Sequence, residues 1–164
     1  MTAFVTVGTT QFDVLIQTLL SDEALALLAT QGYEKLVLQI GRGDDPPAIN
    51  NPPLAIDWFR FKTSLHKDMA DASLIISHAG AGSVLEGMRL RARMVVVVND
   101  ALMDNHQQEL AQELHSQDHL LATTPAKLID ALQTLPQRNV QFRPFPEPNM
   151  EAFPRFLAAH LGLK

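Results

Sequence analysis

The segment of this sequence best suited to chemistry is glycine-rich and covers residues 77–86. It reads Ser-His-Ala-Gly-Ala-Gly-Ser-Val-Leu-Glu and joins a strand-like run to a helix-like one. Small residues let a diphosphate approach the backbone closely, and the free N–H groups of a helix N-terminus attract anions. Leu85 stands where a dinucleotide fingerprint needs its third glycine, and no Gly-Lys-Ser/Thr follows as in a Walker motif. The segment therefore predicts an anion site of another kind.

A carboxylate, Glu86, follows about one turn into the predicted helix. It lies on the side of that helix that faces the strand ends, where it can accept hydrogen bonds from both hydroxyls of a ribose. The alternative interpretation is an acidic residue near a helix start, where the helix dipole favours it. The glycines just before Glu86 favour the ribose interpretation.

The turn after the first predicted strand reads Gly8-Thr9-Thr10. Glycine permits a tight turn, while the threonine hydroxyls and the start of the following helix offer donors to a phosphate. Many strand-to-helix turns carry Gly-Thr without any ligand, so this turn alone is a weak indication of phosphate binding.

A third polar segment, residues 99–107, follows a buried strand and carries Asn105, His106 and Gln107. Amide and imidazole side chains both donate and accept hydrogen bonds, which suits a neutral, hydroxyl-rich ligand such as a sugar. The alternative is simple helix capping by Asp104 or Asn105. Capping and ligand binding are compatible at this place.

The elements that would position these residues alternate between strand-like and helix-like runs. The predicted strands cover residues 3–7, 35–40, 54–59, 74–77, 94–98 and 119–122. The predicted helices cover residues 12–20, 22–30, 64–70, 83–90, 104–117 and 124–135. This alternation predicts a doubly wound α/β domain whose ligands bind at the carboxyl ends of the strands, where all three polar segments fall. Because the loop at residues 42–53 breaks the rhythm, an antiparallel strand and hence a mixed sheet remains an option in the first half.

The last part of the chain, residues 141–164, differs from the rest. Pro144, Pro146 and Pro148 predict an extended segment, and residues 150–163 then predict a terminal helix. Such a helix either packs on its own domain or docks onto a partner chain. We therefore expect a domain over residues 1–140 followed by this tail.

Composition excludes several classes of protein. A chain of 164 residues suits one domain, and the absence of cysteine excludes disulfide scaffolds and Cys-ligated metals. A net charge of −5 disfavours broad nucleic-acid binding. His115 and His119 lack a third ligand, so no metal site is expected. Since no apolar run approaches the roughly 20 residues that span a bilayer and no secretory leader is present, the cytosol is the expected compartment.

Four motifs in order along the chain carry a resemblance to a known family. They are residues 4–10 (FVTVGTT), 38–43 (LQIGRG), 76–83 (ISHAGAGS) and 102–107 (LMDNHQ). Over most of its length the chain resembles the cytosolic catalytic subunits of the eukaryotic UDP-GlcNAc transferase of asparagine-linked glycosylation. More distantly it resembles the donor-binding, C-terminal half of glycosyltransferase family 28, a group of enzymes built from two Rossmann-like halves, the GT-B architecture.

The resemblance implies a role for each candidate site residue, with UDP-GlcNAc as donor and neither cofactor nor metal. A diphosphate would be lined by Gly8, Thr9, Thr10, Gly80, Ala81, Gly82 and Ser83. Glu86 would hold the ribose and Phe61 would lie near the uracil. His106 and Gln107 would hold GlcNAc, with His106 standing where the bacterial pattern has glutamine, and Asn105 beside them would also bind the substrate. The general base belongs to the acceptor half in the bacterial relatives, and His78 and His106 are the candidates within this chain.

The resemblance further implies a partner. This chain supplies one half of a two-half enzyme, whereas the acceptor of the family, GlcNAc-diphosphodolichol, is a membrane lipid. We therefore expect a membrane-anchored subunit that binds the acceptor and recruits the chain to the cytosolic face of the endoplasmic reticulum, with the helix at residues 150–163 docking onto it. Two alternatives stay open: a subunit for another UDP-sugar polysaccharide, and a non-catalytic nucleotide-binding protein.

Overall fold

The computed structural model describes residues 1–99, 105–135, 142–144 and 146. The strands are β1 (Thr2–Thr6), β2 (Lys35–Gln39), β3 (Ala55–Phe59), β4 (Leu74–His78), β5 (Met94–Val97) and β6 (Leu121–Thr123). The helices are α1 (Asp13–Leu19), α2 (Asp22–Thr30), α3 (His66–Ala70), α4 (Ala81–Arg89), α5 (Asn105–Ser116), the 3₁₀ turn η1 (Pro125–Lys127) and α6 (Leu128–Thr134). These confirm the predicted order of elements, while the helix predicted at residues 150–163 lies outside the described residues.

The strands form one sheet in the order β3-β2-β1-β4-β5-β6, and each neighbouring pair is parallel. This is the Rossmann-type order. Strands β2 and β3 are added on one side of β1, and strands β4 to β6 are added on its other side, so the order of connection switches between β1 and β4. The doubly wound prediction is confirmed, whereas the option of a mixed sheet is wrong. The connection over residues 40–54 contains no helix, but it is long enough for the crossover that a parallel neighbour requires.

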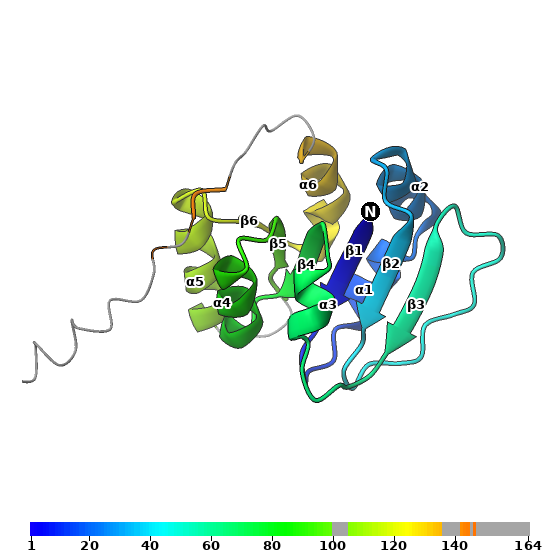
Figure 1. Ribbon diagram of the computed structural model, residues 1–164, viewed down its shortest axis with the longest axis horizontal. Coiled ribbons are helices and arrows are strands. Elements are labelled where there is room, and N and C mark those ends of the chain that lie inside the picture. The colour runs from blue at the N-terminus through cyan, green and yellow to red at the C-terminus, as the bar shows by residue number, and fades with distance from the viewer. Residues whose placement is uncertain (100–104, 136–141, 145, 147–164) are drawn as a thin grey trace, which may run out of the picture.

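Helices cover the two faces of the sheet, as Figure 1 shows. Alternation along β1 points Val5 to one face and Phe4 to the other, and each belongs to a separate apolar cluster. The Val5 cluster includes side chains of α1, α2 and α6, and the Phe4 cluster includes side chains of α3, α4 and α5. Strands that are covered on both faces explain the continuous apolar runs in the sequence.

The start of the tail is attached to the domain. The N–H of Arg143 donates to the carbonyl of Asp118 at 2.9 Å, and Nδ1 of His119 donates to the carbonyl of Arg143 at 2.7 Å. Phe142 packs against the Val5 cluster. In the described part of the chain, no helix has both the length and the apolar character needed to cross a membrane.

Candidate functional site

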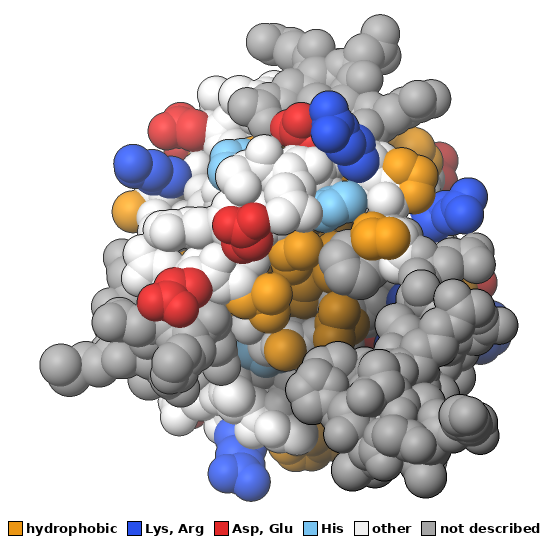
Figure 2. All heavy atoms as spheres, turned by 90° about the vertical axis from the view of Figure 1, so that its left-hand side faces the viewer, with side chains coloured by type: hydrophobic (Ala, Val, Ile, Leu, Met, Phe, Trp, Pro, Cys, Tyr) orange, Lys and Arg blue, Asp and Glu red, His pale blue; other side chains and the backbone are white. Residues whose placement is uncertain are grey.

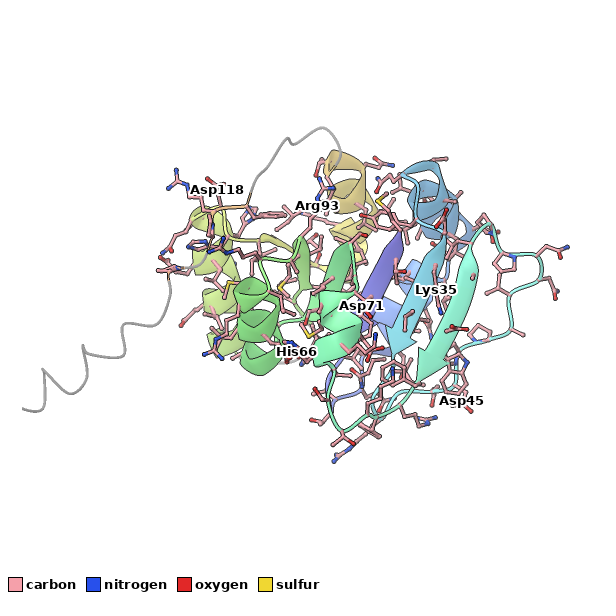
Figure 3. All side chains as sticks on the ribbon, viewed as in Figure 1. Lys35, Asp45, His66, Asp71, Arg93 and Asp118 are labelled. Atoms are coloured by element: carbon pink, nitrogen blue, oxygen red, sulfur yellow. The ribbon has the colours of Figure 1, made fainter. Side chains whose placement is uncertain are left out.

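The candidate site lies at the edge of the sheet where the parallel strands end. Figure 3 shows His66 and Asp45 at this edge, with Arg93 and Asp118 at the opposite one. The turns after β1 and β4 are neighbours here, because β1 and β4 pair in register and separate the two halves of the sheet. Open α/β sheets bind their ligands at such a switch point. The structure thus brings two of the predicted segments, the Gly8 turn and the glycine-rich turn, to one place.

The glycine-rich turn leads directly into α4. Gly80 is the N-cap residue, its backbone is extended, and no side chain caps the helix. The N–H groups of Ala81, Gly82 and Ser83 have no hydrogen-bond partner among the described residues. Helix starts with free N–H groups carry partial positive charge and bind anions. A Cβ added to Gly82, in the first turn of this helix, would meet no atom of the described residues within 4 Å.

The Gly8 turn is held tightly by the protein itself. Gly8 has a left-handed backbone with φ +62°, which glycine adopts without strain. Both the N–H and the hydroxyl of Thr10 donate to the carbonyl of Val7, at 3.3 and 2.8 Å. Thr9 keeps its N–H and hydroxyl without a partner in the described structure. Of the two threonines, Thr9 therefore has the donors that remain for a ligand.

His78, the last residue of β4, fills the space between the two turns. A Cβ added to Gly8 would lie 2.7 Å from its Cε1 atom, and one added to Gly80 would overlap its Nε2 atom. Burial lowers the pKa of His78, although a hydrogen bond to the carbonyl of Thr6 opposes that shift. The ring is therefore neutral near pH 7, with Nδ1 donating to Thr6 at 3.3 Å and Nε2 unprotonated.

Glu86 has a partner that the sequence did not indicate. Its Oε1 atom lies 3.2 Å from Nδ1 of His66, the first residue of α3, and both side chains are exposed. This contact joins α3 to α4 in front of the strand ends. The other carboxylate oxygen, Oε2, has no partner in the described part of the chain.

The remaining candidates follow strands that end at the same edge of the sheet. Phe61 follows β3 and is exposed, and within the described structure no hydrogen bond or ring contact joins it to either turn. Asn105, His106 and Gln107 begin α5 after β5, the strand beside β4, but their side chains lie outside the described part of the chain. Their predicted contact with a sugar therefore stays a prediction.

One buried residue at this edge was missed by the sequence reasoning. Gln39 ends β2 and is 2% exposed, and its side chain bonds to both polar backbone groups of Gly8. The one local indication of its role in the sequence is that Gln39 is the single polar residue in the otherwise apolar run at residues 36–40.

The chain is similar to known glycosyltransferase proteins. The model of the glycosyltransferase family 28 C-terminal domain matches residues 2–158. A mouse protein named UDP-N-acetylglucosamine transferase subunit ALG13 is 47% identical over 74% of this chain, which corresponds to 10% of the mouse protein. Its namesake from Yarrowia lipolytica is 37% identical over 86% of this chain and 74% of its own length.

A solved structure agrees with these relatives. The NMR solution structure of ALG13 superimposes with a TM-score of 0.67 at 29% identity and covers 95% of this chain and 94% of that one. The chain thus spans about a tenth of the mouse relative but most of the fungal one. The resemblance inferred from the four motifs is confirmed. The chain belongs to the glycosyltransferase family 28 C-terminal domain family.

Proposed function

We propose that the chain is the donor-binding subunit of an inverting glycosyltransferase. It would move GlcNAc from UDP-GlcNAc to GlcNAc-diphosphodolichol and form a β1,4 bond, the second step of lipid-linked oligosaccharide synthesis for N-glycosylation. The observation that carries the proposal is the uncapped start of α4 at the switch point of the sheet. Relatives named UDP-N-acetylglucosamine transferase subunits support this choice of donor.

The diphosphate would be bound mainly by backbone groups. The free N–H groups at Ala81–Ser83 and the dipole of α4 would stabilise the charge that grows on the leaving diphosphate as its bond to the anomeric carbon breaks. Thr9, on the facing turn, would add its N–H and hydroxyl. Because these donors supply the stabilisation, the proposal includes no cofactor and no metal.

The rest of the donor would extend along the same edge. Oε2 of Glu86 would accept hydrogen bonds from the ribose hydroxyls, while His66 holds Oε1. Phe61 would lie near the uracil. GlcNAc would contact the start of α5, which follows the strand next to β4.

The acceptor hydroxyl must lose its proton as it attacks the anomeric carbon. We place the general base in a partner subunit, with His78 and His106 as the candidates within this chain. Burial keeps His78 neutral, as a base requires, and Nε2 would be its accepting atom because Nδ1 faces Thr6.

The partner would be a membrane-anchored subunit that binds the lipid acceptor at the cytosolic face of the endoplasmic reticulum. The word subunit in the names of the relatives supports a partner. Figure 2 looks onto the side of the molecule where α4 and α5 lie, and hydrophobic side chains gather near the centre of that side. We propose that the tail at residues 141–164 reaches the partner from the domain of residues 1–140.

Calorimetric titration of the purified chain tests the donor site. We expect UDP-GlcNAc to bind, UDP-glucose to bind more weakly and NADH not to bind. Glu86→Ala should lower the affinity for UDP-GlcNAc by about tenfold, which corresponds to the loss of one charged hydrogen bond. Equal binding of UDP-glucose would indicate another polysaccharide enzyme, and no binding of any UDP-sugar would contradict the proposal.

The same preparation tests the partner. The chain alone should bind the donor without transferring GlcNAc to the lipid acceptor, and co-expression with a membrane subunit should restore transfer. A chain truncated after Pro146 should still bind the donor but no longer co-purify with that subunit. Unchanged association of the truncated chain would show that the tail is not the docking element.

A further inference from the structure

Buried polar side chains gather at one edge of the sheet. In the described part of the chain, the buried polar residues are Thr6, Gln39 and Ser77, near the carboxyl ends of β1, β2 and β4. The other buried side chains of the described residues are hydrophobic, and among them Tyr33 has a hydroxyl that hydrogen-bonds to Arg93. A polar group without a hydrogen bond is costly to bury, so its position needs a reason. All three lie under the candidate site and away from the opposite edge.

Gln39 uses its side chain to hold the Gly8 turn. Its Nε2 donates to the carbonyl of Gly8 at 2.8 Å, and its Oε1 accepts from the N–H of Gly8 at 2.9 Å. Its second N–H donates to the carbonyl of Arg60 at 2.7 Å, and Thr6 Oγ1 donates to Oε1 at 2.5 Å. One buried amide therefore ties together the ends of β1, β2 and β3.

A carboxamide is suited to this task because it donates and accepts at once. Gly8 presents an N–H and a carbonyl to the same side chain, and its left-handed backbone orients both. A carboxylate would offer no donor, and an apolar side chain would leave both groups of Gly8 without these bonds.

We infer that Gln39 is a positioning residue of the donor site. It sets the left-handed Gly8 turn and so presents the N–H and hydroxyl of Thr9 to the diphosphate across from α4. It does not touch the ligand itself. This inference rests on the proposed function, because it assigns the diphosphate to the free donors that the two turns present.

The test compares a ligand that has the diphosphate with one that lacks it. Calorimetry gives the affinity for UDP, and NMR titration gives that for uridine. Gln39→Met keeps the length of the side chain but removes its hydrogen bonds. We expect it to lower the ratio of UDP to uridine affinity by about tenfold, because a misplaced Thr9 affects the phosphates alone. Weakening of both ligands by the same factor would indicate a merely structural role and overturn the inference.

Gln31 provides the matched control. Its Nε2 donates to the carbonyl of Leu132 at 2.8 Å, next to α2 and away from the carboxyl edge. Gln31→Met should leave the affinity ratio unchanged. A drop in the ratio as large as that of Gln39→Met would overturn the inference.

A second variant keeps the test decisive if Gln39→Met does not fold. The neutral carboxyl of Gln39→Glu can donate to the carbonyl of Gly8 and accept from its N–H, although its single donor cannot also reach Arg60. Its ionised form cannot donate at all, and burial favours the neutral form. Relative to wild type at each pH, this variant should bind UDP nearly normally at pH 5 and about tenfold more weakly at pH 8. A pH-independent ratio would overturn the inference. Failure of the wild-type chain to bind UDP would instead overturn the proposed function.

Discussion

The two turns at the switch point are built in opposite ways. The Gly8 turn uses most of its polar groups within the protein, since Gln39 bonds to Gly8 and Thr10 bonds to Val7. The turn at Gly80 leads into α4 without a cap and leaves the N–H groups at Ala81–Ser83 without protein partners in the described structure. The first turn is fixed from within, and the second is open to a ligand.

The glycines differ in the same way. The protein itself requires a glycine next to the Gly8 turn: Gly41 has φ +56°, and an added Cβ would overlap the carbonyl of Thr10 and lie 2.8 Å from that of Gly8. At Gly82 no atom of the described residues lies within 4 Å of an added Cβ. The comparison teaches that a glycine in a binding loop serves either the fold or the ligand, and that the two kinds respond differently to substitution.

The largest expected effect comes from the fold-serving glycine. Gly41→Ala should lower the free energy of unfolding by about 2–4 kcal/mol, because a left-handed alanine is strained and its Cβ pushes on the Gly8 turn. Urea denaturation measures this loss. Gly32→Ala is the control: its φ is +88°, but among the described residues its Cβ would meet only the flexible end of Met1, at 3.1 Å. It should cost about 1–2 kcal/mol, and equal losses would refute the proposed backbone contact.

Local patterns were sufficient to predict most of the fold. The strands are apolar runs that end at glycine or polar residues, and the predicted turn after β4 lies where α4 begins. The direction of β3 was less predictable, because no periodicity in the loop before it distinguishes a return crossover from a hairpin. The alternation of the other elements carried the correct topology.

The parts of the site that the sequence did not predict depend on contacts between residues far apart in the chain. Gln39 lies 31 residues from Gly8 and 21 from Arg60 in sequence, and only the parallel register of β1, β2 and β3 brings them together. His66 and Glu86 are exposed residues 20 apart, joined because α3 packs beside α4. Such pairs leave no local signal in a single sequence.

The next largest effect is expected at Gly82, the glycine that we assign to ligand binding. Gly82→Ala should keep or raise the free energy of unfolding, by up to about 1 kcal/mol, because alanine favours the first turn of α4. Its Cβ should nevertheless weaken UDP binding by about tenfold, since it enters the space assigned to the diphosphate. Unchanged affinity in calorimetry would place the ligand elsewhere. Gly87→Ala is the control in the same helix: its Cβ would overlap the Met94 side chain, so stability should fall while affinity stays.

The smallest effect concerns His78, which contacts both turns. Burial holds its pKa below the ordinary value of 6.5, so below that value the unfolded chain binds a proton more readily than the folded chain. The free energy of unfolding should therefore rise with pH between the lowered pKa and 6.5, with a slope of at most about 1.4 kcal/mol per pH unit, and this group contributes no slope above that window. His78→Gln should remove this contribution. Urea denaturation from pH 5 to 8 measures it, and parallel profiles for wild type and variant would show that the ring between the turns is not held neutral by burial.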